Sequence, residues 1–240
     1  LKQSLSKQDW SMFLESTSLE HIDSNWSIYT SDPIATLIHR DNKIYFNDFI
    51  SNKSAEMGVD PLKAQSEIRQ KLFHAEQLSS EFPFTGGAIA AYHYEMGEIF
   101  ESLNKIETND GLNLSPFHCG FYNWAILYNV HSKQYYLLQH RCKTQNIELD
   151  FLWDFRYQWL KALTNGQEKK GSMFHLTEEW QSDYTEPEYQ NAFTKIQSYI
   201  LSGDCYQVNL AQRFQAQYIG DEYRAYQALI LENKAPFAAF

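Results

Sequence analysis

The most constraining stretch of this sequence is residues 185–214, in which a helix, a forced turn and a strand are expected in succession. Thr185 and Glu188 have the spacing of a capping box, and Pro187 falls in the first turn, where a missing N–H costs little. Gly203 is expected to end the helix, because the left-handed conformation after a last turn is least costly for glycine. Between these ends, apolar residues repeat at helical spacing and require burial: Tyr189, Phe193, Ile196 and Ile200.

After Cys205 the apolar period changes from helical to two, which predicts a strand. Its two faces would carry Tyr206, Val208 and Leu210 on one side, and Gln207, Asn209, Ala211 and Arg213 on the other. The first face is expected to meet the core. Two interpretations of the second face remain open, because a polar strand face either meets solvent or lines a substrate cleft. The cleft-facing candidates are Gln207, Asn209 and Arg213.

Composition excludes several classes of protein. Of 240 residues, 43% are hydrophobic and 16% aromatic, which is too rich for a disordered chain and sufficient for a large core. The net charge is −10 and the basic residues are scattered, so no nucleic-acid partner is expected. No apolar stretch approaches membrane-spanning length, so no membrane partner is expected either. A small-molecule ligand is favoured.

Cysteine usage predicts a cytoplasmic protein. Cys119, Cys142 and Cys205 form no CxxC motif, and neither a disulfide framework nor a signal-peptide pattern is present. A zinc site is an alternative, because an expected hairpin would bring His118 and Cys119 towards His140 and Cys142. Neither pair has the usual ligand spacing, so buried or unreactive side chains are favoured and no metal ligand is assigned.

Short strands and helices fill the rest of the chain. Four strands at 11–17, 26–31, 34–40 and 43–46 are expected to form an antiparallel meander. A strand pair is expected at 121–128, buried on both faces, and 134–140, and another strand at 235–240. Helices are expected at 61–78, 150–163 and 221–233. The first would bury Leu62, Ile68, Leu72 and Ala75, and the second Leu152, Phe155 and Trp159.

This mixture lacks a regular strand–helix–strand alternation, so an α+β fold is predicted. The paired Gly86 and Gly87 favour close backbone approach in a strand over a phosphate cradle, because no P-loop lysine accompanies them. The polar segment 164–171 is the most linker-like, which divides the chain into regions 1–165 and 166–240. Because a strand at 235–240 needs neighbours, we expect the chain to be the front part of a longer protein, truncated at residue 240.

Residues 203–214, GDCYQVNLAQRF, resemble the signature of the chorismate-utilising enzymes, most closely of the aminodeoxychorismate synthases. The similarity extends to 84–101, 122–125, 180–189 and 235–240. It implies antiparallel sheets packed face to face, with helices outside. It also implies the N-terminal part of an enzyme that converts chorismate and ammonia to 4-amino-4-deoxychorismate, with Mg²⁺ as cofactor and a glutamine amidotransferase subunit supplying ammonia.

The same resemblance implies that the family's catalytic lysine, acid/base glutamate and Mg²⁺-binding glutamates lie beyond residue 240. No catalytic or metal residue is therefore assigned, and the chain alone is expected to be inactive. The acidic pair Glu178 and Glu179 is typical of a solvated face.

The resemblance places a tryptophan pocket within this chain. The matching residues are Ser16, Asp23, Ser24, Asn25, Trp26, Pro236, Phe237 and Ala238. Such a pocket needs an apolar slot for the ring and hydrogen bonds for the charged end. The family commonly has an aromatic residue and an arginine where this chain has Asp23 and Asn25, which removes a bidentate partner for the ligand carboxylate. Without the resemblance, Ser16 is an ordinary strand serine and Trp26 a core aromatic.

Three classes of function follow. The first is aminodeoxychorismate synthesis by the full-length enzyme. The second is a related chorismate enzyme, such as an anthranilate or isochorismate synthase. The sequence YQVNL at residues 206–210 disfavours this class. The third is a non-catalytic module that binds tryptophan.

Overall fold

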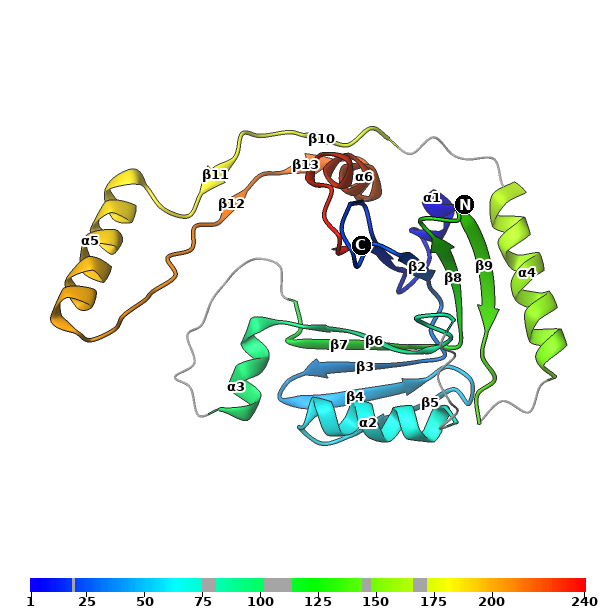
Figure 1. Cartoon of the computed structure of the whole chain (residues 1–240). Coiled ribbons are helices and arrows are strands. Elements are labelled where there is room, and N and C mark those ends of the chain that lie inside the picture. The colour runs from blue at the N-terminus through cyan, green and yellow to red at the C-terminus, as the bar shows by residue number, and fades with distance from the viewer. Residues whose placement is uncertain (19, 75–80, 102–113, 144–147, 166–171) are drawn as a thin grey trace. The chain divides into compact units, whose positions relative to one another are not determined.

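The structure is a computed structural model that describes residues 1–18, 20–74, 81–101, 114–143, 148–165 and 172–240 (Figure 1). The chain divides into two compact units. The first comprises Leu1–Glu168 and Gln227–Phe240, and the second Lys169–Tyr226. Within the described ranges, no helix has both the length and the apolar character that crossing a bilayer requires.

The first unit contains two antiparallel sheets of five strands each. Sheet A has the order β14-β1-β2-β8-β9, with β1 (Met12–Glu15), β2 (Trp26–Thr30), β8 (Trp124–Asn129), β9 (Gln134–Gln139) and β14 (Ala238–Ala239). Sheet B has the order β5-β4-β3-β7-β6, with β3 (Ala35–Arg40), β4 (Lys43–Asp48), β5 (Lys53–Glu56), β6 (Gly87–Tyr92) and β7 (Phe117–Tyr122). The predicted α+β class, with antiparallel sheets and outer helices, is confirmed.

The first four strands do not form one meander, so that prediction is wrong. β1 pairs with β2 in sheet A, whereas β3 pairs with β4 in sheet B. The chain changes sheet at Asp32, which has a left-handed φ of 52°, and at Pro33, which cannot donate to a ladder. Figure 1 shows the strands of sheet A running across those of sheet B.

The strand predicted at 121–128 is two strands. β7 ends at Tyr122 and β8 begins at Trp124, so the chain passes from sheet B to sheet A at Asn123. Every residue from 121 to 127 is at most 6% exposed, which confirms the predicted burial of this stretch. A run that is apolar on both faces lacks the alternation of apolar and polar residues that marks a strand with one buried face. The sequence pattern therefore does not indicate where the chain passes from one sheet to the other.

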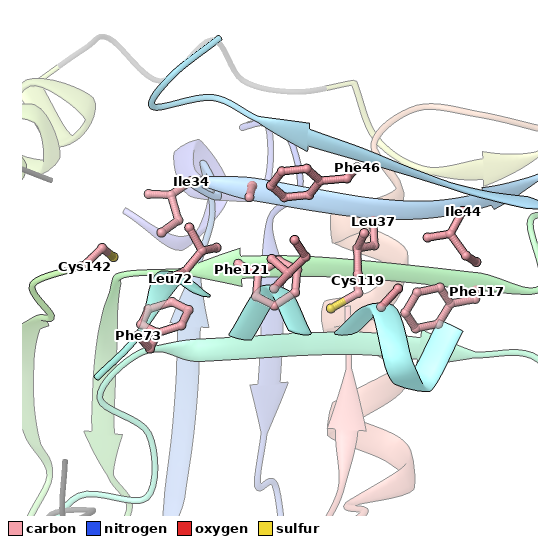
Figure 2. Close-up of a cluster of buried hydrophobic side chains, with 13 residues drawn as sticks. Ile34, Leu37, Ile44, Phe46, Leu72, Phe73, Phe117, Cys119, Phe121 and Cys142 are labelled. Carbon is pink, nitrogen blue, oxygen red and sulfur yellow. The ribbon is translucent and has the colours of Figure 1, made fainter. Parts of the chain in front are cut away.

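Helix α2 (Pro61–Leu72) covers sheet B, and Figure 2 shows the core between them. Its cap is Asp60, whose carboxylate accepts hydrogen bonds from the N–H groups of Leu62 and Lys63. The buried row is Ala64, Ile68 and Leu72, together with Pro61. Leu62 is 50% exposed, contrary to prediction, because it lies on the opposite side of the helix from that row. Ala75 lies outside the described residues.

Helix α4 (Leu149–Asn165) packs on sheet A through Trp159, whose ring meets that of Trp124 edge-on at 5.7 Å. Arg156 is buried between the two indoles and also binds Asp32 at 3.0 Å. Phe155, predicted to be buried, is 56% exposed. Phe155 directly precedes Arg156, which is buried against sheet A in its place. The apolar stem of Arg156 and its cation, which contacts the two indole rings, take the position where an apolar side chain was expected.

Gly86 directly precedes β6 and Gly87 is its first residue, with φ values of 142° and 141°. A Cβ added at Gly86 would lie 2.9 Å from the His140 Cβ and 3.1 Å from the Tyr122 carbonyl oxygen. Close backbone approach, the favoured interpretation of this pair, is therefore confirmed. The short helices of the first unit are α1 (Lys2–Leu5), a 3₁₀ turn at Tyr94–Met96 and α3 (Gly97–Phe100).

The second unit contains two short antiparallel pairs and helix α5. β10 (His175–Leu176) pairs with β13 (Tyr218–Ile219), and β11 (Gln181–Ser182) pairs with β12 (Phe214–Gln215). Helix α5 (Glu186–Ser202) begins with the predicted capping box and ends at Gly203 with a left-handed φ of 83°. None of its residues is buried. Helix α6 (Glu222–Asn233) follows β13.

Residues 205–213 form no regular strand, so that prediction is wrong. Regular pairing begins at β12, next to hydrogen bonds from the N–H of Asp183 to the Arg213 carbonyl and from the Arg213 N–H to the Asp183 carboxylate. A period of two specifies the two faces of a strand but not its hydrogen-bonded neighbour. Tyr206 and Val208, expected to face a core, are 92% and 43% exposed.

Candidate ligand-binding site

A cavity of about 400 Å³ lies within the first unit, against β1, β2 and the segment that contains β14. Seven of the eight residues predicted for a tryptophan pocket line it: Ser16, Asp23, Asn25, Trp26, Pro236, Phe237 and Ala238. The other lining residues are Leu14, Glu15, Ile28, Pro83 and Ala239. The structure therefore brings residues 236–239 and Pro83 together with two neighbouring segments near the start of the chain, residues 14–16 and 23–28.

Antiparallel pairing of β14 with β1 places the end of the chain at the cavity. Ala239 lies opposite Leu14, and Ala238 opposite Glu15. Thr17 fixes the segment before β14, because its hydroxyl and its N–H both donate to the Ala235 carbonyl, at 2.7 and 3.1 Å. Residues 236–239 are thus held along the same strand that carries Glu15 and Ser16.

The turn before β2 forms another wall. Asn25 anchors this turn, because its amide nitrogen donates to the Ile22 carbonyl and its amide oxygen contacts His131 Nε2 at 3.0 Å. Ser24, the remaining predicted residue, is fully buried and does not line the cavity. Its hydroxyl has no hydrogen-bond partner among the described residues.

An aromatic cluster stands on one side of the cavity. The Trp26 ring packs on Phe82 at 5.9 Å and on Tyr136 at 5.8 Å, and these two rings contact each other at 5.1 Å. Phe237 is 74% exposed. Trp26 and Phe237 line the cavity with Pro83, Pro236 and Ile28, and these five side chains offer the apolar surface that a planar ring requires.

Glu15 lies in β1 beside the cavity and is 6% exposed, and its carboxylate lies beside Tyr29 on the opposite face of the strand from the Leu14 side chain. Its Oε1 accepts hydrogen bonds from Lys2 Nζ at 2.6 Å and from the Tyr29 hydroxyl at 2.7 Å. Burial and, next, the Glu15 carboxylate raise the pKa of Tyr29 far above its ordinary value, so the phenol stays protonated and donates. Glu15 Oε2 is buried and has no hydrogen-bond partner among the described residues.

The site prediction missed five lining residues: Leu14, Glu15, Ile28, Pro83 and Ala239. The pairing that makes Leu14 part of a cavity joins it to Ala239 of β14, more than two hundred residues along the chain. Sequence spacing alone does not reveal such a pairing.

The predicted cleft-facing residues are not part of this cavity. Gln207, Asn209 and Arg213 lie in the second unit, and all three are exposed. Their expected common face requires a regular strand at 205–213, which the structure lacks. In this structure, the polar side chains of Gln207, Asn209 and Arg213 therefore face solvent.

The alternative zinc site does not form. His118 and Cys119 are consecutive in β7, so their side chains point to opposite faces. Cys119 belongs to the core of sheet B, whereas the His118 ring lies beside Trp10 and His93. Burial raises the pKa of both Cys119 and Cys142 to about 12. Across the described residues, no group of three or more His, Cys, Asp or Glu side chains is arranged to hold a metal ion.

Crossed antiparallel sheets, outer helices and a largely apolar cavity define an α+β protein with a pocket of small-molecule size. The fold matches that of anthranilate synthase component I from Streptococcus pneumoniae TIGR4, with a TM-score of 0.71 and 21% identity. This match covers 90% of the present chain and 47% of that one. The chain belongs to the chorismate-binding enzyme family, whose sequence profile matches residues 14–240.

Within this family, the chain is similar to aminodeoxychorismate synthase component 1 of Escherichia coli (strain K12), with 34% identity over 98% of this chain and 49% of that protein. The corresponding protein of Salmonella typhimurium is 35% identical over 96% of this chain and 47% of its own length. Anthranilate synthase alpha subunit 1 of Arabidopsis thaliana is 24% identical over 90% of this chain and 39% of its own. The chain spans about half the length of the aminodeoxychorismate synthases that it matches.

Proposed function

We propose that this chain is the N-terminal half of an aminodeoxychorismate synthase component 1. The full-length protein converts chorismate and ammonia to 4-amino-4-deoxychorismate, for p-aminobenzoate and folate biosynthesis. The observation that carries this proposal is the identity of 34–35% with proteins of that name, against 22–24% with anthranilate synthases. The sequence YQVNL at Tyr206–Leu210 also favours an aminodeoxychorismate synthase over an anthranilate synthase.

The proposed reaction needs a divalent ion beside the substrate carboxylates and a general acid at the departing hydroxyl. The described residues offer no cluster that fits such an ion, so we assign neither the Mg²⁺ ligands nor the catalytic groups to this chain. In the proposal they belong to the remaining half of the protein. A glutamine amidotransferase subunit supplies the ammonia, and the cytoplasm, where unpaired thiols stay reduced, is the proposed compartment.

A product assay tests this proposal. Full-length protein is incubated with chorismate, an ammonium salt and Mg²⁺, and the products are separated by chromatography. We expect 4-amino-4-deoxychorismate; anthranilate or isochorismate as the main product would favour a related chorismate enzyme instead. The 240-residue chain alone is expected to give no product, and turnover by it would contradict our placing of the catalytic groups. Glutamine is expected to replace ammonium only when the amidotransferase subunit is added.

We also propose that the cavity binds L-tryptophan or a closely related indole compound. Seven of the eight residues that the family resemblance indicated line one cavity with largely apolar walls, which supports this proposal. Such a ligand would contact both β1 and residues 236–239, and would stabilise their pairing. Calorimetric titration of the 240-residue chain with L-tryptophan tests the site. No heat at millimolar ligand would remove the proposal.

A further inference from the structure

His93 and His118 place two imidazole rings beside each other on neighbouring strands of sheet B, β6 and β7 (Figure 1). The ring centres are 6.1 Å apart, and the ring planes are inclined by 65°. His118 lies within β7, opposite Ala91 of β6. His93 directly follows the end of β6, and its N–H donates to the Pro116 carbonyl at 3.0 Å. Antiparallel hydrogen bonding therefore fixes the backbone beneath both rings.

Both rings project from the face of sheet B that is turned away from helix α2. Their strand neighbours Tyr92 and Phe117 are paired, with ring centres 5.5 Å apart, and Phe117 belongs to the core that α2 covers (Figure 2). Because successive residues of a strand alternate between its faces, His93 and His118 share the other face. Both are half-buried, so solvent reaches them.

The nitrogen atoms of the two rings are available to a ligand. Among the described residues, neither imidazole makes a hydrogen bond or an ion pair, and the closest other ring is that of Trp10, 6.2 Å from His118. Burial and, next, His93 lower the pKa of His118, so this ring is neutral at neutral pH. A neutral imidazole is the form that binds a metal ion.

The separation of the rings suits a shared metal ion. A metal–nitrogen bond of about 2.1 Å places the ion about 3.2 Å from the centre of an imidazole ring, so one ion joins two rings whose centres are at most about 6.4 Å apart. The observed 6.1 Å lies within this limit. Rotation of the half-buried His93 side chain brings the rings nearer where the ion binds them on adjacent sides.

We infer that His93 and His118 form a two-histidine site for a divalent late transition metal, which binds Cu²⁺ most tightly. Imidazole suits Cu²⁺, Ni²⁺ and Zn²⁺, and the affinity of nitrogen ligands is highest for Cu²⁺. No third His, Cys, Asp or Glu joins the pair within the described residues, so water completes the coordination and the four ligands of structural zinc are not met. The site lies on sheet B, apart from the cavity at β1, β2 and β14, and is independent of the proposed tryptophan site.

Calorimetric titration of the 240-residue chain with Cu²⁺, Ni²⁺ and Mg²⁺ tests this inference. We expect Cu²⁺ to bind more tightly than Ni²⁺, and Mg²⁺, which prefers oxygen ligands, not to compete with either. Electron paramagnetic resonance of the chain with one equivalent of Cu²⁺ should show coupling to two imidazole nitrogens. An absence of Cu²⁺ binding, or coupling to a single imidazole, would overturn the inference.

Two substitutions assign the ion to this pair. His93→Gln and His118→Gln each leave one imidazole, and each is expected to weaken Cu²⁺ binding by roughly a hundredfold, because the two ligands no longer act together. His74→Gln is the matched control, since it removes an exposed imidazole of the same unit and should leave the affinity unchanged. Thermal melting checks that each variant is folded. If His118→Gln does not fold, the His93 variant decides, and an unchanged affinity in it would contradict the inference.

Trp10 reports the position of the ion independently. Cu²⁺ bound at the pair is expected to quench the fluorescence of this indole, which lies 6.2 Å from the His118 ring. Trp10→Phe keeps both imidazoles, so the calorimetric affinity should persist while the quenching decreases. Quenching that is unchanged by this substitution would place the ion elsewhere and overturn the inference.

Discussion

Helices α2 and α5 begin alike, each with a side-chain cap and a proline in its first turn. Their environments differ. Helix α2 buries Ala64, Ile68 and Leu72 against sheet B, whereas α5 buries none of its residues, although Phe193 and its apolar neighbours repeat at helical spacing. The cap and the period specify that a helix forms and where it starts. A neighbouring surface decides whether its apolar face stabilises the fold.

The same contrast separates the two units. The first contains the described sheets of five strands and a core of fully buried rings, such as Phe121 and Trp124. The second pairs its strands over two residues at a time and exposes large side chains, including Phe214 at 55%. We therefore expect substitutions and chemical probes to act differently on the two units.

Thiol reactivity should give the largest difference. Burial raises the pKa of Cys119 and Cys142 in the first unit to about 12, which lowers their thiolate fraction near pH 8 by roughly a thousandfold relative to a free thiol. Cys205 of the second unit is half-buried. A thiol-specific disulfide reagent at pH 8 is expected to label Cys205 fast and the other two only as the fold opens. Fast labelling that persists in a Cys205→Ser variant would contradict this contrast.

Truncation of the core should give the largest change in stability. Leu72 of α2 is fully buried, so Leu72→Ala is expected to lower the free energy of unfolding by about 3 kcal/mol, through lost burial and the cavity that remains. Phe193→Ala in α5 is the matched control, because that ring is 52% exposed and should cost much less. Urea unfolding of both variants measures the difference. Equal losses would mean that α5 is packed as α2 is.

Both ends of α5 could be predicted because their signals are local, whereas the first unit's helix α2 ends at Leu72 and not at the predicted residue 78. Thr185, Glu188 and Gly203 interact within a few residues, and the structure places the ends of α5 as expected. The corner at Asn123 could not be predicted, because residues 121–127 are buried on both sides and carry no period. The segment 205–213 has the period of a strand, but its sequence does not specify a hydrogen-bonded neighbour.

The candidate site was predictable to the extent that a family resemblance supplied long-range information. Residues 16, 23–26 and 236–238 share no local pattern, and antiparallel pairing of β1 with β14 brings their segments together. Leu14 was missed because it lines the cavity only through its pairing with Ala239. Hydrophobic period indicates which face of a strand is buried, but not which distant segment of the chain pairs with that strand.

Two glycines with left-handed φ values sharpen the comparison at the level of single residues. Gly86→Ala is expected to cost about 2 kcal/mol, because backbone strain adds to a Cβ contact of 2.9 Å with His140. Gly203→Ala, at the end of α5, has no heavy atom within 4 Å of the added Cβ and should cost about 1 kcal/mol from the backbone alone. Thermal unfolding of the two variants ranks them. A larger effect at Gly203 would show that steric crowding does not set the order.

The capping box of α5 should give the smallest effects, and these should be confined to that helix. Thr185→Ala removes the hydroxyl that accepts the Glu188 N–H, which is expected to cost about 1 kcal/mol and to speed amide hydrogen exchange in the first turn. Hydrogen bonds from the Thr185 hydroxyl and N–H lower the pKa of Glu188. Its contribution to helix stability is therefore complete above the ordinary glutamate pKa and is lost as the pH falls through the lowered one. NMR titration of the Glu188 carboxyl should show that Thr185→Ala moves its pKa back towards the ordinary value, and an unchanged pKa would mean that the box does not persist in solution.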